Sequence, residues 1–338
     1  MRRLDCMLCL GVLAALAAHA APVAAQTYRV DHTFKLGGDG FWDYIALDAG
    51  SNRLFIGRND RVMVVDPVAG KLLGEVPGLN RAHGVAIDEA SGHGFATSGG
   101  DATVVIFDLK TLAVVARTKV DDDADAILRE PTTGRVFTLN GDAMTASVLD
   151  PKTNQHIGTI PLGAKPEFGV ADGAGKVYLN LEDTAEIAEI DAAAMKVARR
   201  WKVAPCEDPT GLAIDTAHRV LFSVCRNRMM AMSAIDSGKV VASVAIGPGA
   251  DAARYDAGTG LAFASTGGDG AITIVHEDSP TAFRVVQTVQ TAPGARTMEL
   301  DAKTHRLYTV TAEFKQPVPQ GRRPELMPGT FELLELSQ

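Results

Sequence analysis

Seven polar residues recur at one position of a repeated phrase, and their types are those of a ligand or metal site. Each stands five residues before an acidic residue that ends a short apolar run, as in Asp43-Tyr-Ile-Ala-Leu-Asp48 and His83-Gly-Val-Ala-Ile-Asp88. The seven are Asp43, His83, Asp125, Glu167, Thr210, Asp251 and Arg296. Carboxylates that converge raise each other's pKa values unless a cation compensates them. The pattern therefore indicates a charged site in which acids meet one imidazole and one guanidinium.

Two kinds of chemistry suit this set of side chains. Oxygen donors with one imidazole favour a divalent metal ion, and the candidate ligands are Asp43, His83, Glu167 and Asp251. Alternatively, His83 acts as a general base beside a carboxylate while Arg296 holds an anionic substrate, so that the catalytic candidates are His83, Glu167 and Arg296. A third interpretation stays open, because polar residues at a wet opening are often only solvated. The sequence contains no GxSxG elbow, HExxH helix or phosphate-cradling loop, which excludes the common hydrolase and nucleotide-binding motifs.

The elements that position these residues belong to a repeat of about 42 residues, which occurs seven times along the chain. Within each copy, short apolar runs alternate with turns rich in Gly, Asn and Asp, such as Gly99-Gly-Asp101. A four-stranded antiparallel sheet cannot bury both faces alone, so the copies must pack around an axis. The sequence thus predicts an all-β, seven-bladed β-propeller with four-stranded blades. The seven polar residues would begin the innermost strands and surround one mouth of the channel.

The last copy lacks one strand, and the N-terminal segment is the candidate to replace it. After residues 296–311 only residues 331–336 form an apolar run, whereas residues 28–36 resemble the fourth strands of other copies. We predict that this N-terminal strand closes the last blade and removes a free sheet edge. Residues 315–328, with four prolines, are predicted to form a long loop on the face that carries the polar ring.

The repeat also resembles that of a known family. Leu307-Tyr-Thr-Val310 and Val177-Tyr-Leu-Asn180 are close to the core of the YVTN repeat. Over essentially all of residues 27–338 the chain resembles the YncE-like exported β-propellers. This resemblance implies the fold more strongly than a function, since propellers include binding modules and enzymes. It implies an exported propeller that binds a small ligand, a metal ion or a partner at the channel mouth. The alternative is a metal-assisted or acid/base enzyme of lactonase or cycloisomerase type that uses the same polar ring.

The first 25 residues are typical of a signal peptide. Arg2 and Arg3 precede an apolar run at residues 8–18 that is too short to span a bilayer, and small residues follow. We expect cleavage after Ala25, with cleavage after Ala20 as the alternative. The expected product is a single propeller domain, residues 26–338, in the periplasm or outside the cell, with no membrane span.

Export changes the interpretation of the cysteines. Only Cys206 and Cys225 follow the cleavage site, and an oxidising compartment favours a disulfide between them. Two buried thiols or half of a metal site are the alternatives. The bridge would stiffen the loop before Thr210 and direct Glu207 toward the channel mouth, which adds Glu207 to the candidate ligand-binding residues.

The composition limits the classes of molecule that we expect the protein to bind. The 338 residues include 33 Lys and Arg against 41 Asp and Glu, a net charge of −8, which argues against binding nucleic acid. A hydrophobic fraction of 46% with 22% charged residues is typical of a globular chain. We expect a monomer whose partner is a small molecule, a metal ion or a periplasmic protein, and whose only cofactor would be a divalent metal. The remaining isolated histidines, interpreted as surface residues near turns, are His156, His218, His276 and His305.

Overall fold

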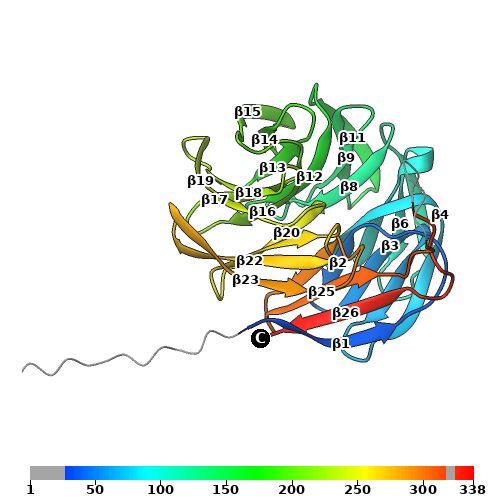
Figure 1. Ribbon diagram of the computed structural model, residues 1–338. Coiled ribbons are helices and arrows are strands. Elements are labelled where there is room, and N and C mark those ends of the chain that lie inside the picture. Colours follow the sequence, from blue (N-terminus) through cyan, green and yellow to red (C-terminus); the bar gives the residue numbers. More distant parts are fainter. Residues whose placement is uncertain (1–26, 317–323) are drawn as a thin grey trace, which may run out of the picture.

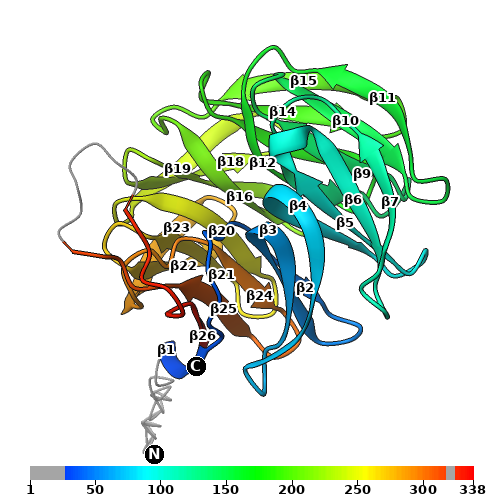
Figure 2. The same ribbon diagram turned by 90° about the vertical axis from the view of Figure 1, so that its right-hand side faces the viewer.

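The fold is a β-propeller, in which antiparallel sheets are arranged around a common axis (Figures 1 and 2). The computed structural model describes residues 27–316 and 324–338. Within these ranges the only helical element is a short 3-10 turn, η1 (Gly99–Asp101). No helix in the described part of the chain is long and apolar enough to cross a membrane. The predicted signal peptide lies outside the described residues.

Five of the sheets have four strands, which pair antiparallel in chain order. The first contains β8 (Ala124–Arg129), β9 (Val136–Asn140), β10 (Thr145–Asp150) and β11 (Gln155–Pro161). The second contains β12 (Pro166–Ala171), β13 (Lys176–Leu181), β14 (Glu186–Asp191) and β15 (Lys196–Lys202). The third contains β16 (Pro209–Asp215), β17 (Val220–Cys225), β18 (Met229–Ala234) and β19 (Lys239–Ala245). The fourth contains β20 (Ala250–Asp256), β21 (Leu261–Thr266), β22 (Ala271–Ser279) and β23 (Ala282–Gln290). The fifth contains β24 (Met298–Asp301), β25 (Arg306–Thr311), β26 (Glu332–Ser337) and, from the other end of the chain, β1 (Arg29–Lys35).

The sixth sheet has six strands, so the prediction of seven four-stranded blades is wrong. It contains β2 (Ile45–Asp48), β3 (Arg53–Asp66), β4 (Lys71–Asp88), β5 (His93–Ser98), β6 (Thr103–Asp108) and β7 (Val114–Lys119). β3 and β4 are 14 and 18 residues long, and each runs without a break through two of the predicted strands. The propeller therefore has six blades, one of which holds two copies of the repeat.

A single pairing explains why the first two copies share a sheet. Asn59, in a predicted hairpin turn, has a positive φ of 43° and pairs with Ala82 in the middle of β4. This pairing continues the sheet through positions where the repeat pattern predicts turns, although Asn59 and Arg81 both have positive φ. The two halves of the large sheet still pack against each other, with the rings of Phe55 and Phe107 5.8 Å apart. Sequence repeats count the copies, but they do not reveal where hydrogen bonding continues from one copy to the next.

The hydrophobic core lies between neighbouring sheets. Side chains from two sheets form most clusters, for example Phe137 and Leu139 with Leu179 and Ile190, while one cluster joins the two halves of the six-stranded sheet. The innermost strands contact one another in a closed ring that runs through β2, the second half of β4, β8, β12, β16, β20 and β24, and back to β2. This ring surrounds the channel and places equivalent residues of each copy side by side.

The N-terminal strand closes the last blade, as predicted. β1 pairs antiparallel with β26, and the Tyr28 hydroxyl donates a hydrogen bond of 2.8 Å to the backbone carbonyl of His305. In the predicted loop at residues 315–328, Phe314 pairs with Leu326, so its described ends lie side by side. Residues 317–323 of this loop lie outside the described residues.

Candidate functional site

The predicted polar ring lies at the N-terminal ends of the innermost strands, and most of its members touch a neighbour. Asp43 contacts both His83 and Arg296, His83 also contacts Asp125, and Arg296 also contacts Asp251. Because the strands start in the same orientation around the channel, equivalent residues from distant parts of the chain converge. Thr210 differs from the others: it is 2% exposed, and its hydroxyl donates to backbone carbonyls of Val224 and Ala250.

Asp43, His83 and Asp125 form the tightest group. The Nδ1 atom of His83 lies 2.5 Å from Oδ2 of Asp43 and 3.3 Å from Oδ1 of Asp125. One ligand atom from each of these residues lies within 4.8 Å of the other two, which is the spacing of a metal site. Asp125 Oδ1 is buried and accepts no well-aligned hydrogen bond. His83 Nε2 is buried beside Gly99, so the imidazole presents Nδ1 to the two carboxylates.

The pKa values of Asp125 and His83 are both raised, so that these two side chains favour their protonated forms. Burial, with the nearby charge of Asp43, raises the pKa of Asp125 to about 7. Burial alone would lower the pKa of His83, but its hydrogen bond to Asp43 and the charge of Asp125 outweigh burial and raise it. The group thus holds more protons near neutral pH than the same residues would in water, and a bound cation would take the place of those protons.

Arg296 neutralises a different part of the ring. Its guanidinium lies 3.3 Å from Asp251 and 3.3 Å from Asp43, and it donates to the backbone carbonyl of Trp42 at 3.1 Å. The charge of Asp251 raises the pKa of Arg296 above its ordinary range. Asp251, a candidate metal ligand by sequence, therefore lies against a cation rather than in the group around His83.

Glu167 remains a carboxyl without a charged partner in the described residues. Burial, followed by repulsion from Asp125, raises the pKa of Glu167 to about 8. The nearby Lys165 donates instead to Glu182, at 2.7 Å. At neutral pH Glu167 is thus mostly protonated, so that it can donate a proton or a hydrogen bond into the channel mouth.

Tyr44 is a member of the site that the sequence reasoning missed. Its hydroxyl donates to the backbone carbonyl of Glu167 at 3.4 Å, and its ring packs against Phe168 at 5.5 Å between centroids. Burial, with the charge of Asp125, raises its pKa well above the ordinary value. The signal was available: the position after the ring residue is small in most copies and aromatic only at residues 44 and 168.

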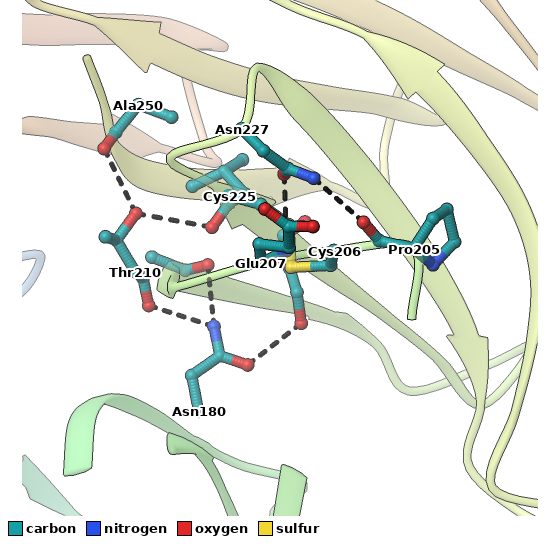
Figure 3. Close-up of a disulfide and its surroundings, with 11 residues drawn as sticks. Asn180, Pro205, Cys206, Glu207, Thr210, Cys225, Asn227 and Ala250 are labelled. Atoms are coloured by element: carbon teal, nitrogen blue, oxygen red, sulfur yellow. Dashed lines mark hydrogen bonds between the residues drawn. A yellow bond between two sulfur atoms is a disulfide. The ribbon is translucent and has the colours of Figure 1, made fainter. Parts of the chain in front are cut away.

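The predicted disulfide between Cys206 and Cys225 is present beside this ring (Figure 3). It links the segment before β16 to the end of β17. Asn180 donates to the backbone carbonyl of Thr210 at 2.9 Å and so ties the start of β16 to the neighbouring sheet (Figure 3). Glu207 is exposed, and its backbone N–H donates to Asn227. The bridge thus fixes the start of the strand, while the Glu207 carboxylate faces solvent.

An open pocket of about 270 Å³ adjoins Arg296. Its other walls are mostly aromatic or apolar: Phe41, Trp42, Gly294, Phe314 and Pro324. Phe314 directly precedes the loop predicted at residues 315–328, and Pro324 lies within that loop. The pocket places a cation next to apolar surface, which suits a ligand that has a negative group and an apolar body.

Comparisons with known proteins support the architecture. The chain is similar to a chain of hydrazine synthase from Kuenenia stuttgartiensis, with 15% identity and a TM-score of 0.69, covering 83% of this chain and 93% of that one. It is also similar to U3-55K (9% identity, TM-score 0.73, 93% and 99% covered) and to the WD40 repeats of RRP9 (10%, 0.74, 94% and 99%). The likeness shows the fold alone. No protein-family model and no curated protein sequence matches, so the resemblance to YncE-like propellers stays a prediction.

Proposed function

We propose that this protein is a ligand-binding β-propeller whose channel mouth holds a divalent metal ion on Asp43, His83 and Asp125. The observation that carries the proposal is the convergence of one oxygen, one imidazole nitrogen and a second oxygen within 4.8 Å. Mixed imidazole and carboxylate donors suit zinc or manganese better than calcium, which prefers oxygen alone. Three protein ligands leave coordination positions open toward the channel.

An organic ligand would use the neighbouring features of the mouth. Arg296 lies between the metal group and the aromatic pocket, so a carboxylate could contact both the ion and the guanidinium. The apolar body of the ligand would then lie against Trp42 and Phe314. We therefore propose a small anionic molecule with an apolar or aromatic part as the ligand class. Export to an oxidising compartment remains part of the proposal, and the disulfide supports it because such bonds persist there.

Calorimetric titration of the metal-free protein with Zn²⁺ tests the metal site. We expect Asp125→Asn and His83→Ala each to weaken binding at the mouth by about 100-fold or more, since even outer partners of a metal cost 10–100-fold. Asp251→Asn is the matched control: it removes an acid from the same ring, but one that contacts Arg296 rather than His83. Equal losses in all three variants would mean that only the summed charge matters, and unchanged affinity in the first two would refute the site.

Benzoate, a small aromatic carboxylate, is the probe for the anionic ligand. Arg296→Gln should weaken benzoate binding, whereas Zn²⁺ binding should stay level or tighten because a nearby positive charge is lost. Benzyl alcohol provides the neutral comparison and should be insensitive to the substitution. If benzoate binds equally well to both proteins, Arg296 serves only to pair with Asp43 and Asp251.

A second function, catalysis, is favoured by one observation, the partnerless carboxyl of Glu167 with its raised pKa. A protonated carboxyl beside a metal ion is suited to general acid catalysis, for instance on a lactone. Hydrolysis of simple lactones by the zinc-loaded protein should then fall above pH 8 and be lost in Glu167→Gln. Glu182→Gln, which changes a nearby acid already paired with Lys165 and Arg226, is the control. Absence of turnover in the wild type would leave the binding function alone.

A further inference from the structure

The other ends of the innermost strands carry a second ring of acids, and in most copies a local turn satisfies it. Three residues after each acid stands a serine or threonine in five of the seven copies: Ser51, Ser91, Thr133, Thr259 and Thr304. The hydroxyl of Thr133 donates to Glu130 at 2.7 Å, that of Thr259 to Asp256 at 2.9 Å and that of Thr304 to Asp301 at 2.7 Å. The hydroxyl at this position is thus a regular structural part of the repeat.

The copy that begins with β16 departs from this rule. The acid is Asp215, and the residue three positions later is His218 instead of a hydroxyl residue. The imidazole Nδ1 of His218 lies 2.7 Å from Oδ2 of Asp215. An imidazole, which can bind a metal ion, therefore stands where five other copies have a hydroxyl residue.

A second departure from the repeat meets the first. Glu277 in β22 donates its backbone N–H to Gly260, just as Leu109, Ala192 and Ile235 do to the equivalent residues of their own copies. Those three equivalent side chains are apolar and buried. The carboxylate of Glu277 therefore occupies a position that is apolar in those three copies. It contacts His218, the histidine that replaces the hydroxyl residue in the neighbouring copy.

The buried carboxylate of Glu277 is poorly satisfied. Its side chain is 1% exposed, and neither of its oxygens accepts a well-aligned hydrogen bond, although Nδ1 of His218 lies 3.1 Å from Oε1. The Tyr255 hydroxyl is also close and donates to Asp215 at 3.2 Å. Burial raises the pKa of Glu277, although the nearby Tyr255 hydroxyl acts in the opposite direction. Asp215 and Glu277 are thus two buried acids that share one histidine, His218, and lie beside one phenol, Tyr255. Burying a carboxylate whose charge is not compensated is costly in free energy.

We propose that Asp215, His218 and Glu277 bind a divalent transition-metal ion between the sheets of β16 and β20. One ligand atom of each residue lies within 4.8 Å of the others. A divalent ion neutralises both carboxylates, whereas a protonated imidazole neutralises only one. The side chain of His218 is 51% exposed, so the ion has access to solvent and keeps an open coordination position. The mixed nitrogen and oxygen donors favour zinc, cobalt or manganese over calcium.

This site is independent of the proposed function, because Asp215 lies at the opposite end of its innermost strand from the ring that contains Asp43, His83 and Asp125. The two sites can be separated by titrating the metal-free full chain with Zn²⁺ and by following Co²⁺ absorption in the visible range. In the Asp125→Asn background, which removes a ligand of the mouth, one ion should still bind. Adding His218→Ala should weaken that binding by about 100-fold or more and remove the remaining Co²⁺ bands.

His305→Ala is the matched control. His305 is also a half-exposed histidine on a buried acid, with Nδ1 2.6 Å from Asp256, but the hydroxyl of Thr259 already satisfies that acid. Zn²⁺ affinity should therefore be unchanged in this variant. Glu277→Gln should behave like His218→Ala if it folds, and His218→Ala, an exposed truncation, keeps the test valid if it does not. Unchanged binding in His218→Ala, or no binding in the Asp125→Asn protein, would overturn the inference, whatever becomes of the mouth.

Discussion

Both ends of the innermost strands carry acids, yet the protein treats the two ends in opposite ways. At the end that carries the turns, burial alone would raise the pKa of Glu130, but the hydroxyl of Thr133 and the backbone N–H groups of Thr132 and Thr133 outweigh it and lower the pKa. The pKa of Asp48 is likewise lowered by hydrogen bonds from Ser51, although burial alone would raise it. These acids are held in the charged form by donors only two or three residues away.

In the described part of the chain, the carboxylates of Asp125 and Glu167 have no such donors from a local turn. Asp125 and Glu167 are half-buried, face other acids and have raised pKa values. Partners at the mouth come from other copies of the repeat, as His83 and Arg296 do for Asp43. The comparison teaches that an acid supplied with donors by its own turn serves the fold, whereas acids left to repel one another across a channel are available for a ligand.

The largest expected effect is a pH dependence of stability to which the acids of the mouth contribute. Because the pKa values of Asp125 and Glu167 are raised to about 7 and about 8, the folded protein binds more protons than the unfolded chain between about pH 5 and pH 8. Stability must then fall as the pH rises through this window, by up to about 1.4 kcal/mol per pH unit for each extra proton. The raised pKa of His83 acts in the same direction. Urea unfolding of the metal-free protein at several pH values measures the slope.

Two substitutions assign that slope to one end of the strands. Glu167→Gln should flatten it, because the neutral amide resembles the protonated acid. Glu130→Gln should leave it unchanged, since the lowered pKa of Glu130 affects stability only at more acidic pH. A stability that rises between pH 5 and pH 8 would contradict the contrast between the two rings.

The disulfide is the next largest contribution, and it holds the mouth end of β16. The bridge joins residues 19 positions apart, so the loss of unfolded-chain entropy corresponds to about 3 kcal/mol. Replacing both Cys206 and Cys225 by Ala should lower the free energy of unfolding by about that amount in chemical denaturation. Treatment of the wild type with a reductant should reproduce the loss. A double variant as stable as the oxidised protein would show that the non-local bonds of Asn180 suffice.

The sequence allowed the propeller, its closure by β1 and the disulfide to be predicted, because each depends on a short, regular pattern. The predicted number of blades was wrong, because Asn59 pairs with Ala82 and joins two copies of the repeat in one sheet. The hydrophobic periodicity of the sequence does not indicate such a pairing. A strand boundary depends on backbone hydrogen bonds, whereas the repeat records only which side chains are buried.

The ring of the candidate site could also be predicted, but not its division into groups. Equal positions in each copy place Asp43, His83 and Asp125 together, yet the pairing of Asp251 with Arg296 depends on side-chain reach across blades. The burial of Glu277 could not be predicted, because a single glutamate in a strand is usually a surface residue. Only alignment of the copies reveals that its place belongs to the core.

A smaller effect is expected from neutralising the ring at the turns. Glu130→Gln keeps the shape of the side chain but places an amide N–H against backbone donors, which should cost about 2 kcal/mol at pH 7. Asp236→Asn, which alters an exposed acid paired with Arg219, should cost less than about 1 kcal/mol. Thermal and urea unfolding of both variants provide the measurement. Equal losses would mean that the local donors add nothing beyond a surface ion pair.

The smallest effect is expected where one copy departs from the rule of the turn ring. His218→Thr restores the hydroxyl residue that five other copies have, and its hydroxyl should donate to Asp215 as Thr133 does to Glu130. The stability of the metal-free protein should therefore change by less than about 1 kcal/mol, the worth of one hydrogen bond. Thr259→Ala, which removes the regular hydroxyl next to Asp256, should lose about 1 kcal/mol in the same urea assay. If His218→Thr loses much more stability than Thr259→Ala, the imidazole is a structural partner of Glu277. The side chain three residues after the acid would then stabilise the fold in this copy as it does in the others. If the two differ in the expected order, the histidine is dispensable for folding, and its presence beside two buried acids calls for a ligand.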